Sequence, residues 1–226
     1  MTEVRFYFDF ISPFSWLALT QAPAMGKRLG IRWDLRPVVY SRLLDAHGLM
    51  GPGEVPSKRQ VIFADAVRSA QRLGKELIGP PVHPFSSIAA VRVACLFSKE
   101  RGGLDLCVAL ANAAWAEGRD LTDLSVLEDV VTRSGFTAGN LVQRLQDRTI
   151  KNRLRTFTQG AVTAGIFGVP TFILEGDVLW GHDRLAHLEE IITGKLVTRT
   201  DLVEDLLKRP RGIDRPGVRE RFARGQ

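Results

Sequence analysis

The chain has 226 residues, 45% hydrophobic and 25% charged, which is typical of a globular protein with ample length for a core. Residues 197–226 contribute +3 of the formal net charge of +6. Because no basic stripe interleaved with aromatic residues is present, we expect no nucleic-acid partner. No apolar run approaches the about 18 residues of a membrane span, and the N-terminus lacks a secretory pattern. We therefore expect no membrane association and a soluble cytoplasmic protein of one domain, with or without a large insertion.

The N-terminal region predicts a strand, a helix and a second strand. Residues 4–10, Val-Arg-Phe-Tyr-Phe-Asp-Phe, are typical of a buried strand. Apolar residues at helical spacing predict a helix from Pro13 to about Leu29, with Gly30 as its C-terminal cap. Ile31 to Val39 is the second predicted strand. A strand-helix-strand crossover implies that the two strands are parallel.

The middle of the chain, from about Tyr40 to Gly165, predicts helices joined by Gly- and Pro-rich loops. The predicted helices cover residues 57–74, 86–99, 104–117, 123–133, 138–147 and 149–164. The two cysteines, Cys95 and Cys107, lie in apolar helical sequence. Neither their spacing nor their context indicates a metal site or a redox pair, so we interpret them as buried free thiols.

The remaining segments predict a hairpin and a helix. Pro170 to Leu174 and Val178 to Trp180 form the predicted hairpin, because Gly176 between them favours a turn. Asp183 to Ile192 is the last helix of the body. A short helix near 201–208 follows in a peripheral tail that is rich in Arg, Pro and Gly.

A strand, a turn, a helix start at Ser12-Pro13 and a distant Val169-Pro170-Thr171 are the frame of a thioredoxin-like redox protein. Such a protein carries Cys-x-x-Cys at the helix start, where this chain has Ser12 and Ser15. A hydroxyl cannot form a disulfide, so dithiol exchange through this motif is excluded. A hydroxyl can still donate a hydrogen bond to a thiolate that another molecule supplies, and this favours a thiol cofactor, glutathione above all.

The predicted fold class is α/β: a thioredoxin-like fold of the DsbA type, interrupted by a large all-helical insertion. Residues 1–40 and 166–195 form the discontinuous thioredoxin-like domain. Residues 41–165 form the helical insertion, and residues 196–226 form a basic C-terminal extension.

Ser12 has two compatible interpretations. Ser at the N-cap followed by Pro is a favoured helix start, so Ser12 can be a structural cap. A helix N-terminus also stabilises an anionic sulfur, as the low pKa values of cysteines at such positions show. For Val169-Pro170 we predict a cis bond that exposes backbone to a peptide-like ligand, the alternative being an ordinary trans proline at a strand start.

Four further residues are candidates for binding. Asp183 is either an N-cap or a ligand for the ammonium group of glutathione, and His182 is interpreted as a residue that lines the site. The four histidines of the chain show no metal-binding spacing. Lys58 lies near a predicted helix start, where a cation hints at an anionic partner, although most such lysines are only solvated. His83-Pro84-Phe85 precedes another helix, for which Ser86 is the expected cap.

Together these segments resemble the kappa-class glutathione transferase family and, within it, the bacterial 2-hydroxychromene-2-carboxylate isomerases. The resemblance covers roughly residues 3–195. The segments that carry it are Phe8–Trp16, Glu54–Arg59, His83–Phe85, Trp115–Asp120, Gly165–Phe172 and Trp180–Leu185. Several ordered segments are far more specific than any one of them alone.

The resemblance implies a homodimeric, glutathione-dependent enzyme. Ser12 would hold the glutathione thiolate, and the backbone of Val169 before cis Pro170 would pair with glutathione. Lys58, His182 and Asp183 complete the implied cofactor site. The residues implied to face a small anionic or electrophilic substrate are Phe14, Lys58 and His83.

Two positions depart from the family pattern. Leu49 and Ser86 stand where an Asn is common, so this chain lacks two amide groups at the expected substrate site. The implied reaction is isomerisation of a 2-hydroxychromene-2-carboxylate in the breakdown of aromatic compounds, by reversible thiolate addition, bond rotation and elimination. Two alternatives stay open: a glutathione transferase or peroxidase that acts on small electrophiles, and a non-catalytic glutathione-binding protein. Leu49 slightly favours both alternatives.

Overall fold

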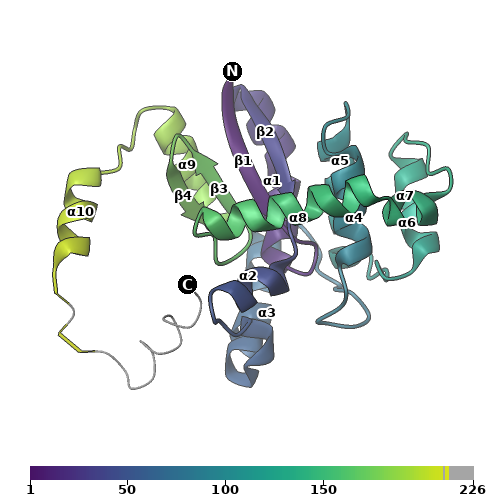
Figure 1. Ribbon diagram of the computed structural model, residues 1–226, viewed down its shortest axis with the longest axis horizontal. Helices are drawn as coiled ribbons and strands as arrows, with labels where there is room; N and C mark the ends of the chain where they lie inside the picture. Colours follow the sequence, from purple (N-terminus) through teal and green to yellow (C-terminus); the bar gives the residue numbers. More distant parts are fainter. Residues whose placement is uncertain (211, 214–226) are drawn as a thin grey trace.

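The structure is a computed structural model that describes residues 1–210, 212 and 213. A mixed sheet with the strand order β2-β1-β3-β4 lies at its centre (Figure 1). The strands are β1 (Thr2–Phe8), β2 (Ile31–Pro37), β3 (Thr171–Leu174) and β4 (Asp177–Trp180). β1 pairs parallel with β2 and antiparallel with β3, and β3 pairs antiparallel with β4. The predicted parallel pair and the predicted hairpin are therefore confirmed.

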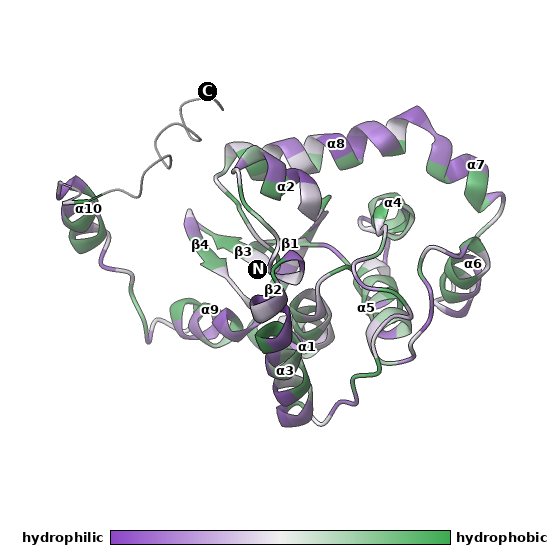
Figure 2. Ribbon diagram, turned by 90° about the horizontal axis from the view of Figure 1, so that it is seen from below, coloured by the Kyte–Doolittle hydropathy of each residue, from purple (hydrophilic) through white to green (hydrophobic). Residues whose placement is uncertain are grey.

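Helices cover both faces of this sheet. α1 (Pro13–Leu29) and α9 (Leu185–Ile192) lie on one face, and α8 (Arg148–Thr163) crosses the other (Figure 2). α1 ends where we predicted, because Gly30 at its C-cap has the left-handed φ of 64°. The helix predicted to open at Asp183 begins instead at Leu185. Asp183 lies in the preceding 3₁₀ turn η2 (His182–Arg184), where it makes no side-chain cap.

The segment between β2 and β3 is helical, as predicted. The helices that precede α8 are α3 (Pro56–Arg72), α4 (Ile88–Phe97), α5 (Gly103–Trp115), α6 (Leu124–Arg133) and α7 (Leu141–Gln146). The prediction missed the short α2 (Tyr40–Ala46) and the 3₁₀ turn η1 (Pro52–Glu54). The prediction that Ser86 caps α4 was also wrong, because Ser87 occupies the N-cap position. The Ser87 side chain makes no capping hydrogen bond either.

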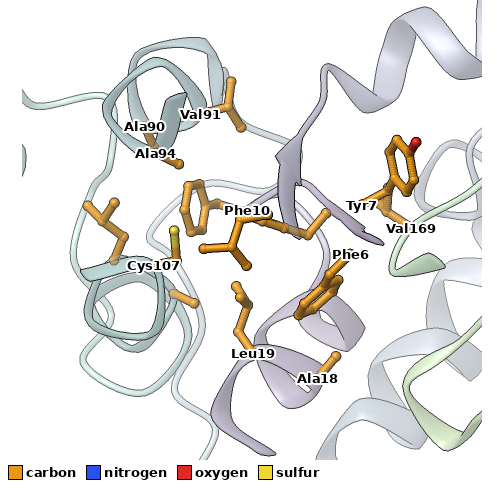
Figure 3. Packing of buried hydrophobic residues seen from close by; sticks show 14 of the residues in the cluster. Phe6, Tyr7, Phe10, Ala18, Leu19, Ala90, Val91, Ala94, Cys107 and Val169 are labelled. Carbon is orange, nitrogen blue, oxygen red and sulfur yellow. The ribbon is translucent and has the colours of Figure 1, made fainter. Parts of the chain in front are cut away.

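One continuous core joins the sheet to the helical segment. Phe10, just after β1, is fully buried and lies among side chains of α4 and α5, including Val91 and Cys107 (Figure 3). Phe6, Phe172 and Trp33 pack against one another between the sheet and α1, with ring centroids 4.7–6.1 Å apart. Since the segment that follows β1 is buried on the helical side, the start of α1 is fixed by both halves of the protein.

The C-terminal extension, 196–226, lies partly outside the described residues. Its helix near 201–208 is confirmed as α10 (Thr200–Lys208), which lies apart from the body in Figure 1. Among the described helices, none is both long enough and apolar enough to cross a membrane.

Candidate functional site

Ser12 is the N-cap of α1, as the Ser-Pro sequence predicts. Its backbone is extended, and its Oγ accepts a hydrogen bond of 3.2 Å from the backbone N–H of Ser15. The same hydroxyl lies 3.5 Å from the carbonyl oxygen of Val169, at the outer limit for a hydrogen bond. Ser12 therefore caps the helix with its lone pairs, while its proton is only weakly engaged.

The Val169–Pro170 bond is cis, as predicted. The Val169 carbonyl lies beside Ser12 although the two residues are 157 positions apart. Figure 3 shows Val169 beside Tyr7 of β1. Within the described part of the chain, the backbone N–H of Val169 has no hydrogen-bond acceptor. A buried residue with an unpartnered N–H at the site is a place where an extended ligand can add a backbone hydrogen bond.

Asp9 supports the turn that carries Ser12, and sequence reasoning missed it. Its carboxylate is buried, accepts the N–H of Ile11 at 3.1 Å and accepts the N–H of Tyr40 at 2.9 Å. Burial raises the pKa of Asp9, while the hydroxyl of Ser87 and these N–H groups lower it in part. The signal in the sequence was a lone carboxylate between Phe8 and Phe10, because a charged residue in an apolar run must find hydrogen-bond donors.

His83 reaches the same turn from the loop before α4. Its Nε2 lies 3.1 Å from the carbonyl oxygen of Ile11, so this nitrogen carries the proton and donates. The ring packs edge-on between Phe63 and Trp115, with centroids 5.1 and 5.6 Å away. Desolvation by burial lowers the pKa of His83, which keeps the ring neutral. His83 thus contacts the chain beside Ser12, and its ring is held by structural contacts.

Phe14 and His182 meet at the start of α1. Their rings stack with centroids 5.0 Å apart and an interplanar angle of 9°. Burial lowers the pKa of His182, so its ring is neutral at neutral pH. Asp183, the next residue, is exposed and pairs with Arg184 at 3.2 Å. Five of the residues predicted for one site thus lie on or beside the first turn of α1: Ser12, Phe14, Val169, Pro170 and His182.

Lys58 lies exposed in the first turn of α3. No carboxylate of the described residues lies within ion-pair distance of its ammonium group. The guanidinium of the next residue, Arg59, covers the Phe63 ring that packs on His83. The start of α3 therefore presents an unneutralised cation, and Arg59 beside it is connected to His83 through the Phe63 ring.

Two exposed aromatic residues flank Val169, and sequence reasoning did not single them out. Phe167 and Trp180 are 39% and 53% exposed, and their rings meet edge to face with centroids 4.8 Å apart. A Cβ at Gly168 would lie 2.5 Å from the Trp180 indole nitrogen, so only glycine fits there without a shift. Exposed large aromatic rings beside an unpartnered backbone group are typical of a binding surface.

Comparison with known proteins matches the DSBA-like thioredoxin domain to residues 3–193. A 2-hydroxychromene-2-carboxylate isomerase of Sphingobium xenophagum is 31% identical over 195 residues, which is 84% of this chain and 97% of that protein. The chain belongs to the DSBA-like thioredoxin family, as a relative of the 2-hydroxychromene-2-carboxylate isomerases. Rat glutathione S-transferase kappa 1 is 24% identical over 207 residues, covering 85% of this chain and 91% of its own.

A solved 2-hydroxychromene-2-carboxylate isomerase structure covers 88% of this chain and 98% of its own, with 27% identity and a TM-score of 0.78. The DSBA-like fold with a helical insertion is thereby confirmed. The same comparisons identify the chain as an enzyme of the 2-hydroxychromene-2-carboxylate isomerase type, with kappa-class glutathione transferases as the other named relatives.

A dithiol protein of this fold carries its cysteines at the start of α1, whereas the two cysteines of this chain lie in α4 and α5. Cys95 and Cys107 are both free and buried, as predicted. Burial raises the pKa of Cys95 to about 12 and raises the pKa of Cys107 further. Neither thiol is a nucleophile at neutral pH. A reactive sulfur at the start of α1 must therefore come from a bound molecule.

Proposed function

We propose that this protein is a glutathione-dependent isomerase of the 2-hydroxychromene-2-carboxylate isomerase type, acting on intermediates of aromatic breakdown. One observation carries the proposal: a helix N-terminus capped by Ser12, with a weakly engaged hydroxyl proton, faces the backbone of Val169. The isomerases among the relatives, which span most of this chain, support the reaction class.

The residues present fit glutathione. Pro13 has no N–H and the N–H of Ser15 already bonds to Ser12, but the N–H of Phe14 has no acceptor within the described residues. That N–H, the helix dipole and the Ser12 proton all favour a negative charge at the start of α1. The unpartnered N–H of Val169 and its weakly engaged carbonyl suit the backbone of a tripeptide.

Each residue then has a defined task. Ser12 donates its proton to the sulfur and keeps its lone pairs on the N–H of Ser15. Asp183 and the neutral ring of His182 hold the γ-glutamyl end of the ligand, and Lys58 pairs with a carboxylate of the cofactor or substrate. Glutathione, when bound, supplies a thiolate nucleophile that can turn a hindered double-bond rotation into a single-bond rotation.

The substrate surface is aromatic on two sides of the first turn of α1. Phe14 stacks on His182, and Phe167 meets Trp180 beside Gly168. A planar aromatic substrate can stack on such rings, and Lys58 can attract its carboxylate. On the basis of the family resemblance, we also propose that the protein is a homodimer in the cytoplasm.

A second candidate, a glutathione transferase or peroxidase on small electrophiles, is favoured by Leu49. This residue is 43% exposed and stands where the family often has an amide side chain. The same thiolate site would serve this reaction. A transferase or peroxidase has no step in which the thiolate is eliminated again from the substrate. The loss of an amide contact with the substrate would therefore matter less.

Two measurements test the proposal. Calorimetry with reduced glutathione, up to millimolar, should give saturable heat, and S-methylglutathione should bind more weakly because it lacks a thiolate. Addition of 2-hydroxychromene-2-carboxylate should then change its ultraviolet spectrum only when glutathione is present. Glutathione binding with turnover of 1-chloro-2,4-dinitrobenzene alone would support the transferase. Absence of glutathione binding would exclude both.

A further inference from the structure

A cavity lies in the helical segment. The helices around it lie on the side of the molecule away from α9 and α10 (Figure 2). It has a volume of about 370 Å³ and lies between α4, α6 and α7. Its lining residues are Ser86, Ile88, Ala89, Arg92, Leu124, Val142, Leu145 and Gln146. Ser86 also stands at the expected substrate site, but none of the other lining residues is among those assigned to the site around Ser12.

Arg92 is the charged group of this cavity. Ile88, Ala89 and Arg92 share one face of α4, because they are three and four residues apart. The Nε of Arg92 is buried and has no hydrogen-bond partner. No carboxylate of the described residues lies within ion-pair distance of the Arg92 guanidinium. By contrast, Arg153, also near Cys95, donates to the Cys95 carbonyl oxygen at 2.7 Å.

The walls of the cavity are apolar, and some of them are unusually exposed. Ile88 and Val142 are 41% and 50% exposed, while Leu145 is buried below them. Ser86 and Gln146 add hydrogen-bonding groups to the lining. The first turn of α4 also contributes the positive end of its helix dipole. An apolar surface with one unneutralised cation is complementary to a ligand that joins a ring to an anion.

We propose that this cavity binds a small amphipathic carboxylate, with its ring against Ile88, Val142 and Leu145 and its carboxylate on Arg92. A volume of about 370 Å³ is at the small end for ligand sites, which suits one or two fused rings. The site goes beyond the proposed function and does not require glutathione. It borders the catalytic turn, because Ser86 lines the cavity and Ser87 lies against the Asp9 carboxylate.

The test uses 1-naphthoate as the probe and the uncharged 1-naphthamide as its matched control, with binding measured by equilibrium dialysis. The acid should bind wild type roughly tenfold more tightly than the amide, because a hydrogen bond to a charged group is at stake. Arg92→Met keeps an unbranched side chain and should remove that preference. Arg92→Lys should restore part of it, and Arg68→Met, which changes an exposed arginine of α3, should leave it unchanged.

Two further observations separate this cavity from the Ser12 site. Binding of 1-naphthoate should shift the amide NMR signals of Ile88, Ala89 and Val142, and Ser12→Asp should leave its affinity unchanged. Equal affinity of the acid for wild type and for Arg92→Met would overturn the proposal, as would equal affinity of the acid and the amide or no binding. Loss of all naphthoate binding in Ser12→Asp would place the probe at the catalytic site and would also overturn it.

Discussion

The carboxylate of Asp9 accepts a 2.9 Å hydrogen bond from the backbone N–H of Tyr40, the first residue of α2. Its other oxygen accepts the N–H of Ile11. One buried side chain therefore joins the turn before Ser12 to the start of α2, which follows β2. The Ser12 N–H also bonds to the Asp9 carbonyl oxygen, at 3.2 Å. Asp9 thereby fixes the position of the turn that carries Ser12.

Asp9→Asn should lower the free energy of unfolding by about 1–3 kcal/mol at neutral pH, because an amide group would face an N–H donor. The Asp9 pKa is raised above 3.8 in the folded state, so the folded protein binds this proton more tightly than the unfolded chain. The stability advantage of wild type over Asp9→Asn should therefore shrink as pH rises from about 3.8 to the folded pKa, and stay constant above it. Urea unfolding across pH measures this; an advantage that grows with pH would contradict it.

Ser12 variants separate a cap from a thiolate-binding residue. Ser12→Ala should cost about 0.5–2 kcal/mol of stability through the lost cap. If Ser12 also donates to glutathione, the pKa of the bound thiol should rise, each unit corresponding to about 1.4 kcal/mol of thiolate stabilisation. The ultraviolet absorbance of the thiolate, followed against pH, reports this pKa.

Ser12→Asp is the sharper control, because Asp is also a good N-cap but places a negative charge beside the sulfur. We expect this variant to fold normally and to lose activity. Wild-type turnover by folded Ser12→Asp would show that Ser12 is only structural and that the proposed thiol site is wrong.

His83→Phe should keep the aromatic packing against Phe63 and Trp115 but lose the hydrogen bond to Ile11, at a cost of about 1 kcal/mol. Burial lowers the pKa of His83 below 6.5, so the unfolded chain binds more protons than the folded one as pH falls below that value. Wild type should therefore lose stability below about pH 6.5, and His83→Phe should lose less of it.

His182→Asn provides a second test of this pH effect, since burial also lowers the pKa of His182. Each variant should remove part of the acid sensitivity, and the double variant should remove more than either. Thermal melting between pH 5 and 8 measures all four proteins. An unchanged pH profile in His83→Phe would show that folding does not lower the pKa of His83, contrary to this prediction.

Gly168→Ala should disturb the site, because its Cβ would lie 2.5 Å from the Trp180 indole nitrogen. We expect a displaced indole, seen as a change in tryptophan fluorescence, a loss of about 1–3 kcal/mol and weaker glutathione binding. Gly160→Ala in α8 is the matched control, because a Cβ there meets nothing within 4 Å. It should stabilise the helix by about 0.5–1 kcal/mol and leave glutathione binding unchanged.

The two cysteines should not react in the folded protein. Both are buried, and burial raises the pKa of both thiols, that of Cys95 to about 12. Iodoacetamide at neutral pH should alkylate both thiols only after denaturation, as measured by mass. A Cys95→Ala and Cys107→Ala double variant should retain glutathione-dependent activity. Loss of that activity with an unchanged circular dichroism spectrum would implicate a protein thiol.

The sequence by itself determined the local features of the protein. Ser12-Pro13 specified the start of α1, Gly30 its end, and the apolar runs specified the paired strands. These features depend on the conformational preferences of a few adjacent residues, so they are visible in a short stretch of sequence. The serines at the expected cysteine positions also excluded a disulfide at the helix start.

Only the tertiary structure decided which distant groups meet. The family resemblance implied that Ser12, Val169, Phe14 and His182 share a site. Their contacts come from the structure: Ser12 meets the Val169 carbonyl 157 positions away, Phe14 stacks on His182, and the Nε of Arg92 is left without a partner. The burial of Asp9 likewise depends on the helical segment that covers the end of β1. Hydrogen-bond partners and pKa shifts follow from three-dimensional burial rather than from local preference, and for that reason the sequence alone did not reveal them.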